Sequence, residues 1–140
     1  MVGTTQGMFE MLAAPLTEGA DCRMRFQLVG ACLRVWAEGT SSFAATVACW
    51  QQVIEQVRTL APRSVLLLDE LRGRDLTAAE WESLVQATRG QGLERVRIAH
   101  VKPQGTDELE YCEIHARESG LDARVFADEA SALLWLRDAT

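Results

Sequence analysis

The chain has 140 residues, of which 48% are hydrophobic and 24% are charged, and its formal net charge is −6. This length and composition fit one globular domain with one core and argue against extended disorder. The 20 acidic side chains outnumber the 14 basic ones, and the absence of a basic run argues against nucleic-acid binding, which depends on clustered Lys and Arg.

The first residues show no targeting signal. The first basic residue is Arg23, whereas a secretory signal peptide needs a positively charged start, and Val2 stands where myristoylation needs glycine. The longest uncharged run, 39–54, is too short and too polar to span a bilayer. We therefore expect a cytoplasmic protein without stable membrane insertion. Residues 1–20 show no sustained period and are interpreted as an N-terminal tail, followed by one α/β domain at 21–140.

The four cysteines are far apart in the sequence: Cys22, Cys32, Cys49 and Cys112. Without a C-x-x-C motif they disfavour both a zinc knuckle and a disulfide framework, and they are interpreted as small apolar core residues. Cys112 and His115 would share a face of a predicted helix, but no residue nearby in the sequence supplies the two further ligands that zinc needs. We expect no metal and no cofactor.

The first predicted elements form a hairpin. Residues 24–28 alternate between apolar and polar side chains, and residues 32–37 do so again after Gly30, which allows a turn. Trp36 shares its strand face with Arg34, away from the apolar side chains. The edge hairpin with Trp36 is therefore a second candidate for contact with a partner.

The strongest periodic signal predicts a helix from about Ser42 to Ala61. Its apolar residues recur at steps of three and four, which places them on one stripe: Phe43, Val47, Trp50, Ile54, Val57 and Ala61. Thr40, Ser41 and Ser42 offer N-caps, and Pro62 ends the helix.

The next segment, Val65–Leu68, is apolar without alternation, as in a central parallel strand that is covered on both faces. Thr77 and Glu80 then have the spacing of a capping box. The helix that they open is expected to end at Gly90 and Gly92 and to carry four residues on its inner face: Trp81, Leu84, Val85 and Thr88.

The last elements repeat this alternation of strand and helix. Residues 95–101 predict a strand, Thr106 begins a helix that Gly120 ends, and 123–127 is the last strand. Asp128 is expected to cap a final helix whose inward residues are Ala130, Leu133 and Leu134. The order β-β-α-β-α-β-α-β-α predicts a single α/β domain: a mostly parallel central sheet of about five strands, an N-terminal antiparallel hairpin, and helices on both faces.

Charged side chains follow the predicted strands at their carboxyl ends, where ligands bind in open α/β sheets. The candidate binding residues are Asp69, Arg72, Arg74, His100 and Lys102. We expect them to gather along one edge, where a locally positive patch favours an anionic group on a partner or ligand. The alternative is that these charges only solvate the strand end and that Asp69 pairs with one of the arginines.

Asp69 does not fit the enzyme and switch families that keep an aspartate after an apolar strand. A phospho-accepting receiver domain needs a hydroxyl where Ala99 and His100 stand, and a D-x-D phosphatase needs an aspartate where Leu71 stands. The chain has no P-loop, no G-x-S-x-G motif and no H-E-x-x-H motif. We expect no enzymatic activity, and an enzyme that uses Asp69 is the distant alternative.

Four segments resemble the SpoIIAA-like (STAS/SEC14-type) bacterial domains: SVLLLDE, TAAEWESLV, RVRIAHV and ARVFADEASALLWLR. With the order of the elements, the resemblance covers about residues 22–138. It implies a STAS-like fold and a small regulatory or protein-interaction module without enzymatic activity. The SEC14-type members of the group imply the alternative, a small-molecule or lipid-binding domain.

The resemblance also implies where a phosphorylation switch would lie. In anti-anti-sigma members a phosphorylated serine begins the helix after the third strand, but here that region reads DELRGRDLTAAEW, without serine, and Thr77 is the nearest hydroxyl. No site residue of the family is carried over. The expected partner is another protein or a second copy of the chain, a small anionic or lipid ligand is the alternative, and nucleic acid is not expected.

Overall fold

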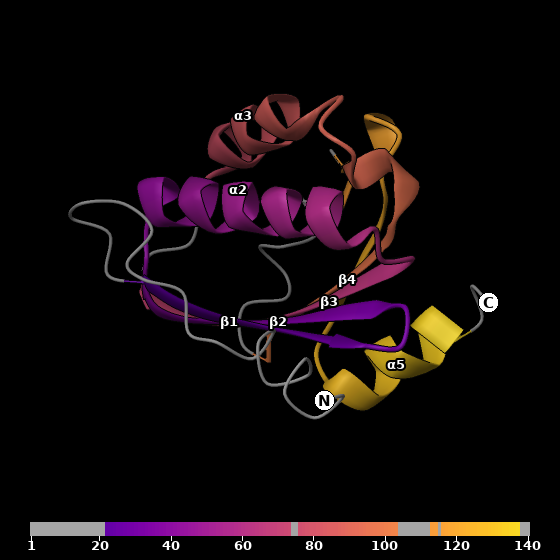
Figure 1. The fold of residues 1–140 in the computed structure, drawn as a ribbon. Coiled ribbons are helices and arrows are strands. Elements are labelled where there is room, and N and C mark those ends of the chain that lie inside the picture. Colours follow the sequence, from indigo (N-terminus) through magenta and orange to yellow (C-terminus); the bar gives the residue numbers. More distant parts are fainter. Residues whose placement is uncertain (1–21, 74–75, 104–112, 115, 138–140) are drawn as a thin grey trace.

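The computed structural model describes residues 22–73, 76–103, 113–114 and 116–137 (Figure 1). The predicted tail at 1–20 and four residues named above lie outside the described residues: Arg74, Thr106, Cys112 and His115. In the described part, five strands form one sheet in the order β1-β2-β3-β4-β5. β1 is antiparallel to β2, and β2 to β5 are parallel, which confirms the predicted α/β domain with an N-terminal hairpin.

The arrangement of the helices follows from this strand order. The strands are β1 (Cys22–Val29), β2 (Cys32–Ser41), β3 (Ser64–Gly73), β4 (Arg97–Val101) and β5 (Asp122–Phe126). The helices whose bounds lie within the described residues are α2 (Phe43–Leu60), α3 (Ala78–Thr88), the 3₁₀ turn η1 (Leu93–Arg95) and α5 (Glu129–Arg137); residues 113–114 and 116–118 are also helical. Because the parallel connections all step across the sheet in the same direction, right-handed crossovers put α2 and α3 on one face. Helix α5 follows the last strand and lies on the other face (Figure 1).

Helix α2 begins and ends close to where the sequence predicts. Ser42 Oγ accepts a hydrogen bond from the N–H of Ala45 at 3.0 Å, which caps the first turn. The chain leaves the helix at Ala61, whose φ is 49°, just before Pro62. The predicted stripe is confirmed for Trp50, Ile54 and Val57, which are buried, while Phe43 and Val47 are partly buried against the same core.

Helix α3 confirms its predicted capping box. Thr77 Oγ1 accepts from the N–H of Glu80 at 3.1 Å, and Glu80 Oε1 accepts from the N–H of Thr77 at 2.9 Å. The Thr77 hydroxyl is thus an acceptor in the helix cap. The four residues predicted for the inner face are all buried: Trp81, Leu84, Val85 and Thr88.

The middle strands are longer than the side-chain pattern predicts. The pattern predicts ends at Ala37 and Leu68, whereas β2 continues to Ser41 and β3 to Gly73. Every residue of β2 pairs with one of β3, and this pairing holds polar sequence in a strand. Residues 69–72 therefore lie inside β3, and the prediction that Arg72 follows the end of this strand is wrong.

Helix α5 is capped as predicted but turns a different side to the sheet. Asp128 Oδ1 accepts from the N–H of Ser131 at 2.7 Å. The buried residues are Ala132 and Leu136, with Trp135 packed beside them, whereas the predicted inward residues Leu133 and Leu134 are 37% and 61% exposed. Ala130 is exposed as well. Two neighbouring stripes of this helix are apolar, and packing on the sheet decides between them.

The two faces of the sheet are covered unequally. The larger core lies under α2 and α3, and the smaller one joins α5 to β3, β4 and β5 through Leu66, Ala99, Val101, Ala132 and Leu136. On the α5 side, the parts of β1, β2 and β3 that extend beyond this smaller core carry polar side chains and one tryptophan. We call this surface the open face; it comprises Arg23, Arg25, Arg34, Trp36, Glu38, Glu70 and Arg72.

Candidate functional site

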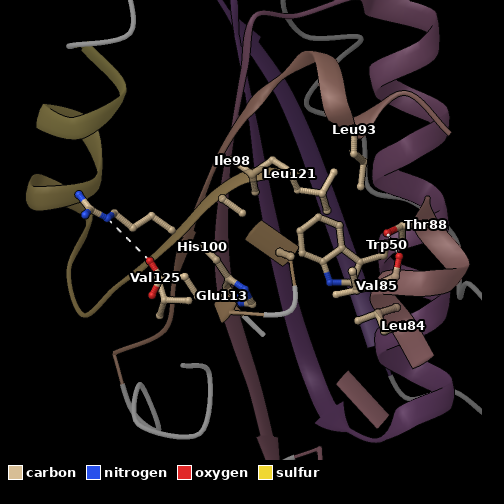
Figure 2. A pocket seen from close by; sticks show the side chains of 13 residues that line it. Trp50, Leu84, Val85, Thr88, Leu93, Ile98, His100, Glu113, Leu121 and Val125 are labelled. Atoms are coloured by element: carbon tan, nitrogen blue, oxygen red, sulfur yellow. Dashed lines mark hydrogen bonds and ion pairs between the residues drawn. The ribbon is translucent and has the colours of Figure 1, made fainter. Parts of the chain in front are cut away.

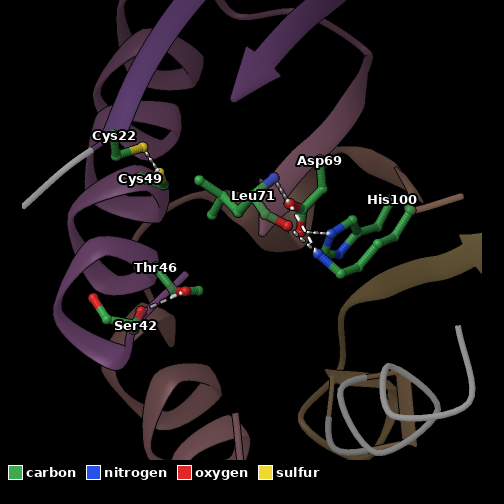
Figure 3. A network of polar contacts seen from close by, with 8 residues as sticks. Cys22, Ser42, Thr46, Cys49, Asp69, Leu71 and His100 are labelled. Atoms are coloured by element: carbon green, nitrogen blue, oxygen red, sulfur yellow. Dashed lines mark hydrogen bonds and ion pairs between the residues drawn. The ribbon is translucent and has the colours of Figure 1, made fainter. Parts of the chain in front are cut away.

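A buried polar cluster joins the carboxyl end of β4 to β3 (Figure 3). His100 Nε2 lies 2.8 Å from Asp69 Oδ2, and Lys102 Nζ lies 3.4 Å from Asp69 Oδ1. The N–H of Leu71 donates to Asp69 Oδ1 at 3.0 Å, and Lys102 Nζ donates to the carbonyl oxygen of Leu71 at 3.0 Å. We call Asp69, Leu71, His100 and Lys102 the Asp69 network.

The charges of this network are nearly withdrawn from water. The side chains of His100, Asp69 and Lys102 are 4%, 11% and 12% exposed. Burial by itself raises the pKa of Asp69, but the hydrogen bond and charge of His100, the charge of Lys102 and the Leu71 N–H outweigh it and leave that pKa below 3.8. Asp69 is therefore ionised at neutral pH.

The ionised carboxylate fixes the proton on its histidine partner. Because Asp69 accepts only, His100 Nε2 carries the hydrogen and donates it, and a neutral His100 then has its lone pair on Nδ1. The imidazole is also held edge-on by Trp50 and Trp81, with ring centroids 6.1 and 6.4 Å away. Three donors of the chain occupy the carboxylate, so it acts as a clamp between β3 and β4.

The structure brings together three of the five predicted site residues. Asp69, His100 and Lys102 share the face under α2 and α3, because side chains alternate along each strand and the register aligns β3 with β4. Arg72 is exposed on the opposite face, three residues after Asp69, and Arg74 lies outside the described residues. Asp69 pairs with His100 and Lys102 and not with Arg72, so these residues do not form one positive rim. Their role in binding stays a prediction.

A small apolar cavity lies beside His100 (Figure 2). Trp50, Leu84, Ile98 and Leu121 are among its lining residues, and its volume is about 40 Å³. An engineered cavity of about 150 Å³ holds one benzene, and pockets for drug-sized ligands measure about 300–1,000 Å³. The cavity is thus too small for a lipid or a comparable organic ligand.

A wider groove of about 480 Å³ runs between the outer sides of α2 and α3. Its polar lining comes from exposed positions: Gln51, Glu55 and Arg58 on α2, and Gln91 after the end of α3. The opposite charges of Glu55 and Arg58 lie close together on α2, so they offset each other. The groove has the volume of a ligand site. However, its lining residues include no set of buried polar groups that point toward one place in it.

The open face has a different character, because its central side chain is aromatic. The guanidinium carbons of Arg25 and Arg34 lie 5.0 and 5.3 Å from the centre of the Trp36 ring. Arg34 also forms an ion pair with Glu129 of α5. Arg25 has no carboxylate within ion-pair distance among the described residues. An exposed cationic side chain that has no acid partner in the described part of the chain therefore lies over a half-buried aromatic ring.

Further charges surround this centre. Arg23 and Glu38 form an ion pair of 3.0 Å with side chains that are 70% and 55% exposed, and Glu70 and Arg72 are exposed on β3. Sequence reasoning selected Trp36 and the edge hairpin and placed Arg34 on the same strand face, but it missed Arg25. The alternation of residues 24–28 already puts Arg25 on the polar side of its strand, but only the hairpin register places it opposite Trp36.

In the described ranges, no group of three or more His, Cys, Asp or Glu side chains is arranged to hold a metal ion. No helix that the structure describes has an apolar stretch long enough to cross a bilayer. A scan against models of protein families gave no match, and no curated protein matches the chain.

Proposed function

We propose that this chain is a non-enzymatic protein-interaction module of the STAS-like type, and that its open face binds an acidic segment of a partner protein. The observation that carries this proposal is the contact of Arg25 and Arg34 with the Trp36 ring, on the part of the sheet that α5 leaves open. Trp and Arg are the residue types most enriched among the residues that dominate binding at protein interfaces.

Charge supports an acidic partner. Arg25 has no ion pair among the described residues, and Arg72 is exposed on the same face. The chain as a whole is acidic, with a net charge of −6, so a local cationic site on it selects where a carboxylate can approach. A partner carboxylate beside Arg25 would gain a charge-assisted hydrogen bond and cover the Trp36 ring.

Shape supports a protein over a small molecule. The open face is a sheet surface, whereas small-molecule sites are concave and bury most of the ligand. A lipid, the alternative that the sequence resemblance implies, would need far more room than the cavity of about 40 Å³ beside His100 provides. An enzyme that uses Asp69 gains no support either, because donors of the chain already occupy its carboxylate.

The proposal is tested by titrating the full chain with two fluorescent peptides of equal length, one rich in Glu and Leu and the other with Lys in place of Glu. We expect the acidic peptide to bind, the basic one not to bind, and Trp36→Ala or Arg25→Ala to weaken binding at least tenfold, which corresponds to about 1.4 kcal/mol. Added salt should also weaken it, because the contact is partly electrostatic.

Arg89→Ala is the matched control, since it removes one exposed arginine from the end of α3, away from the open face. Its affinity for the acidic peptide should equal that of the unmodified chain. Equal binding of both peptides, no binding of the acidic one, or an unchanged affinity in Trp36→Ala would each contradict the proposal.

A further inference from the structure

Two cysteines from different elements meet in the core on the α2 side of the sheet (Figure 3). Cys22 is the first residue of β1 and Cys49 lies in the middle of α2, yet their Sγ atoms are 3.0 Å apart. Both residues are buried, at 2% and 4% exposure. The sequence suggests only small apolar core residues at these positions, because a separation of 27 residues gives no sign that they meet.

The distance between the sulfur atoms is close to that of a bond. A disulfide has a length of about 2.05 Å, so the two sulfur atoms need to approach by only about 1 Å. Cys32 offers a contrast within the same hairpin, because it packs with the smaller core on the α5 side. Of the three cysteines that the structure describes, only Cys22 and Cys49 are therefore in position to join.

We propose that Cys22 and Cys49 are a redox modification site, at which a peroxide converts the two thiols into a disulfide that ties β1 to α2. One thiolate attacks hydrogen peroxide, which breaks the O–O bond, forms a sulfenic acid and releases hydroxide. The sulfur of the second cysteine then displaces the hydroxyl from the first, so the S–S bond forms as water leaves. Two thiols and one peroxide give one disulfide and two waters, and the sulfurs lose the two electrons that the peroxide gains.

The surroundings set how fast this site reacts. The hydrogen bond to Cys22, burial and the nearby Asp69 charge all raise the pKa of Cys49 above its ordinary value of 9.0. Since the thiolate is the reactive form, oxidation is slow at neutral pH and faster at alkaline pH. A small oxidant such as hydrogen peroxide also suits thiols that are this deeply buried.

The disulfide would restrain the hairpin whose other side forms part of the open face. It closes a loop between residues 27 positions apart, so we expect the melting temperature to rise by about 10 °C. The site does not depend on the proposed binding function, because it involves the opposite side of β1.

The experiment treats the folded full chain with hydrogen peroxide at mildly alkaline pH, blocks remaining thiols, and digests it without reduction. Cleavage after arginine leaves Cys22, Cys32 and Cys49 on three separate peptides, so each pairing has its own mass. We expect a linked Cys22–Cys49 pair, a loss of about 2 Da from the intact chain before blocking, and a melting temperature that returns to its starting value after reduction.

The variants separate the pair from the other thiols. Cys49→Ala and Cys22→Ala should abolish the linked peptide and the rise in melting temperature, and Cys32→Ala should keep both. Circular dichroism before oxidation verifies that each variant folds. If a variant does not fold, the linked peptide from the unmodified chain still tests the proposal. The proposal is overturned if the folded chain yields no Cys22–Cys49 link, or if another pair accounts for the rise in melting temperature.

Discussion

The two faces of the sheet differ in what their polar side chains do, although β3 supplies residues to both. Under α2 and α3, Asp69, His100 and Lys102 satisfy one another and are almost excluded from water. On the open face, Arg25 stacks over Trp36 without an acid partner among the described residues.

This difference separates charged groups that pair with one another inside the fold from an exposed one that has no acid partner among the described residues. Asp69 looks reactive in the sequence because it ends an apolar run, yet its hydrogen-bonding capacity is used inside the chain. Arg25 looks ordinary in the sequence, yet it lies exposed over Trp36 with no carboxylate within ion-pair distance among the described residues. Burial and partners in the fold, and not residue type, distinguish the two.

The largest expected effect contrasts a new charge on the covered side with one on the open side. Ile54→Asp places a carboxylate at a position that is 6% exposed in the larger core. An unpaired buried charge costs several kcal/mol against a total stability of about 5–15 kcal/mol, so we expect the domain to unfold or to lose most of its stability in urea.

Val29→Asp is the matched control, because Val29 is 46% exposed on the other side of β1. It should cost no more than about 1 kcal/mol, the range of strand preference. A cooperative urea transition of Ile54→Asp at the midpoint of the unmodified chain would show that α2 does not bury this position.

A smaller effect is expected from the Asp69 network. Asp69→Asn keeps the size of the side chain but leaves the buried Lys102 charge without its carboxylate, which should cost about 3 kcal/mol of unfolding free energy. Glu70→Gln removes the neighbouring carboxylate from the exposed face and should change stability by less than about 0.5 kcal/mol. Equal losses in the two variants would break the distinction between the faces.

The pH dependence sharpens the same prediction. The pKa of Asp69 lies below 3.8 in the folded chain, so the folded state takes up this proton less readily than the unfolded state. The resulting stabilisation is fully present above the pKa of the unfolded state and is lost as the pH falls through the folded value. The unmodified chain should therefore exceed Asp69→Asn in free energy of unfolding at neutral pH, and this difference should become smaller as the pH falls to about 3. Urea unfolding at a series of pH values measures it. A difference in unfolding free energy that becomes larger at acid pH would contradict the lowered pKa of Asp69.

The smallest effect is expected for Arg72→Ala. Arg72 is exposed on the open face and takes no part in the Asp69 network, so its loss should change stability by less than about 0.5 kcal/mol. In a double-mutant cycle with Asp69→Asn, the two effects should add. A coupling energy above about 0.5 kcal/mol would show that Arg72 interacts with Asp69.

Local pattern predicts the elements of this chain well, because each signal depends on residues a few positions apart. The stripe around Trp50 and Ile54 and the caps at Ser42, Thr77 and Asp128 are present as expected, and so is the order of the strands and helices among the described residues. Turns of helix and alternation along a strand bring such neighbours together whatever the rest of the chain does.

Only part of the candidate site could be predicted in the same way. The prediction that neighbouring parallel strands bring Asp69, His100 and Lys102 together is confirmed, since β3 pairs with β4. The same prediction missed that β3 continues past Asp69, because pairing with β2 holds Arg72 in the strand and turns it to the other face. The choice between two apolar stripes on α5 likewise depended on packing.

The sequence alone determined that this is one α/β domain with a hairpin at its start, since periodicity and capping depend only on residues a few positions apart. The tertiary structure decided which side chains meet across the sheet: Arg25 with Trp36, Asp69 with His100, and Cys22 with Cys49. These pairs are distant in the sequence or depend on strand register, and a shift of one residue would turn each strand side chain to the opposite face. The physical reason is that long-range pairing is fixed by the free energy of the whole packed core, which no single segment contains.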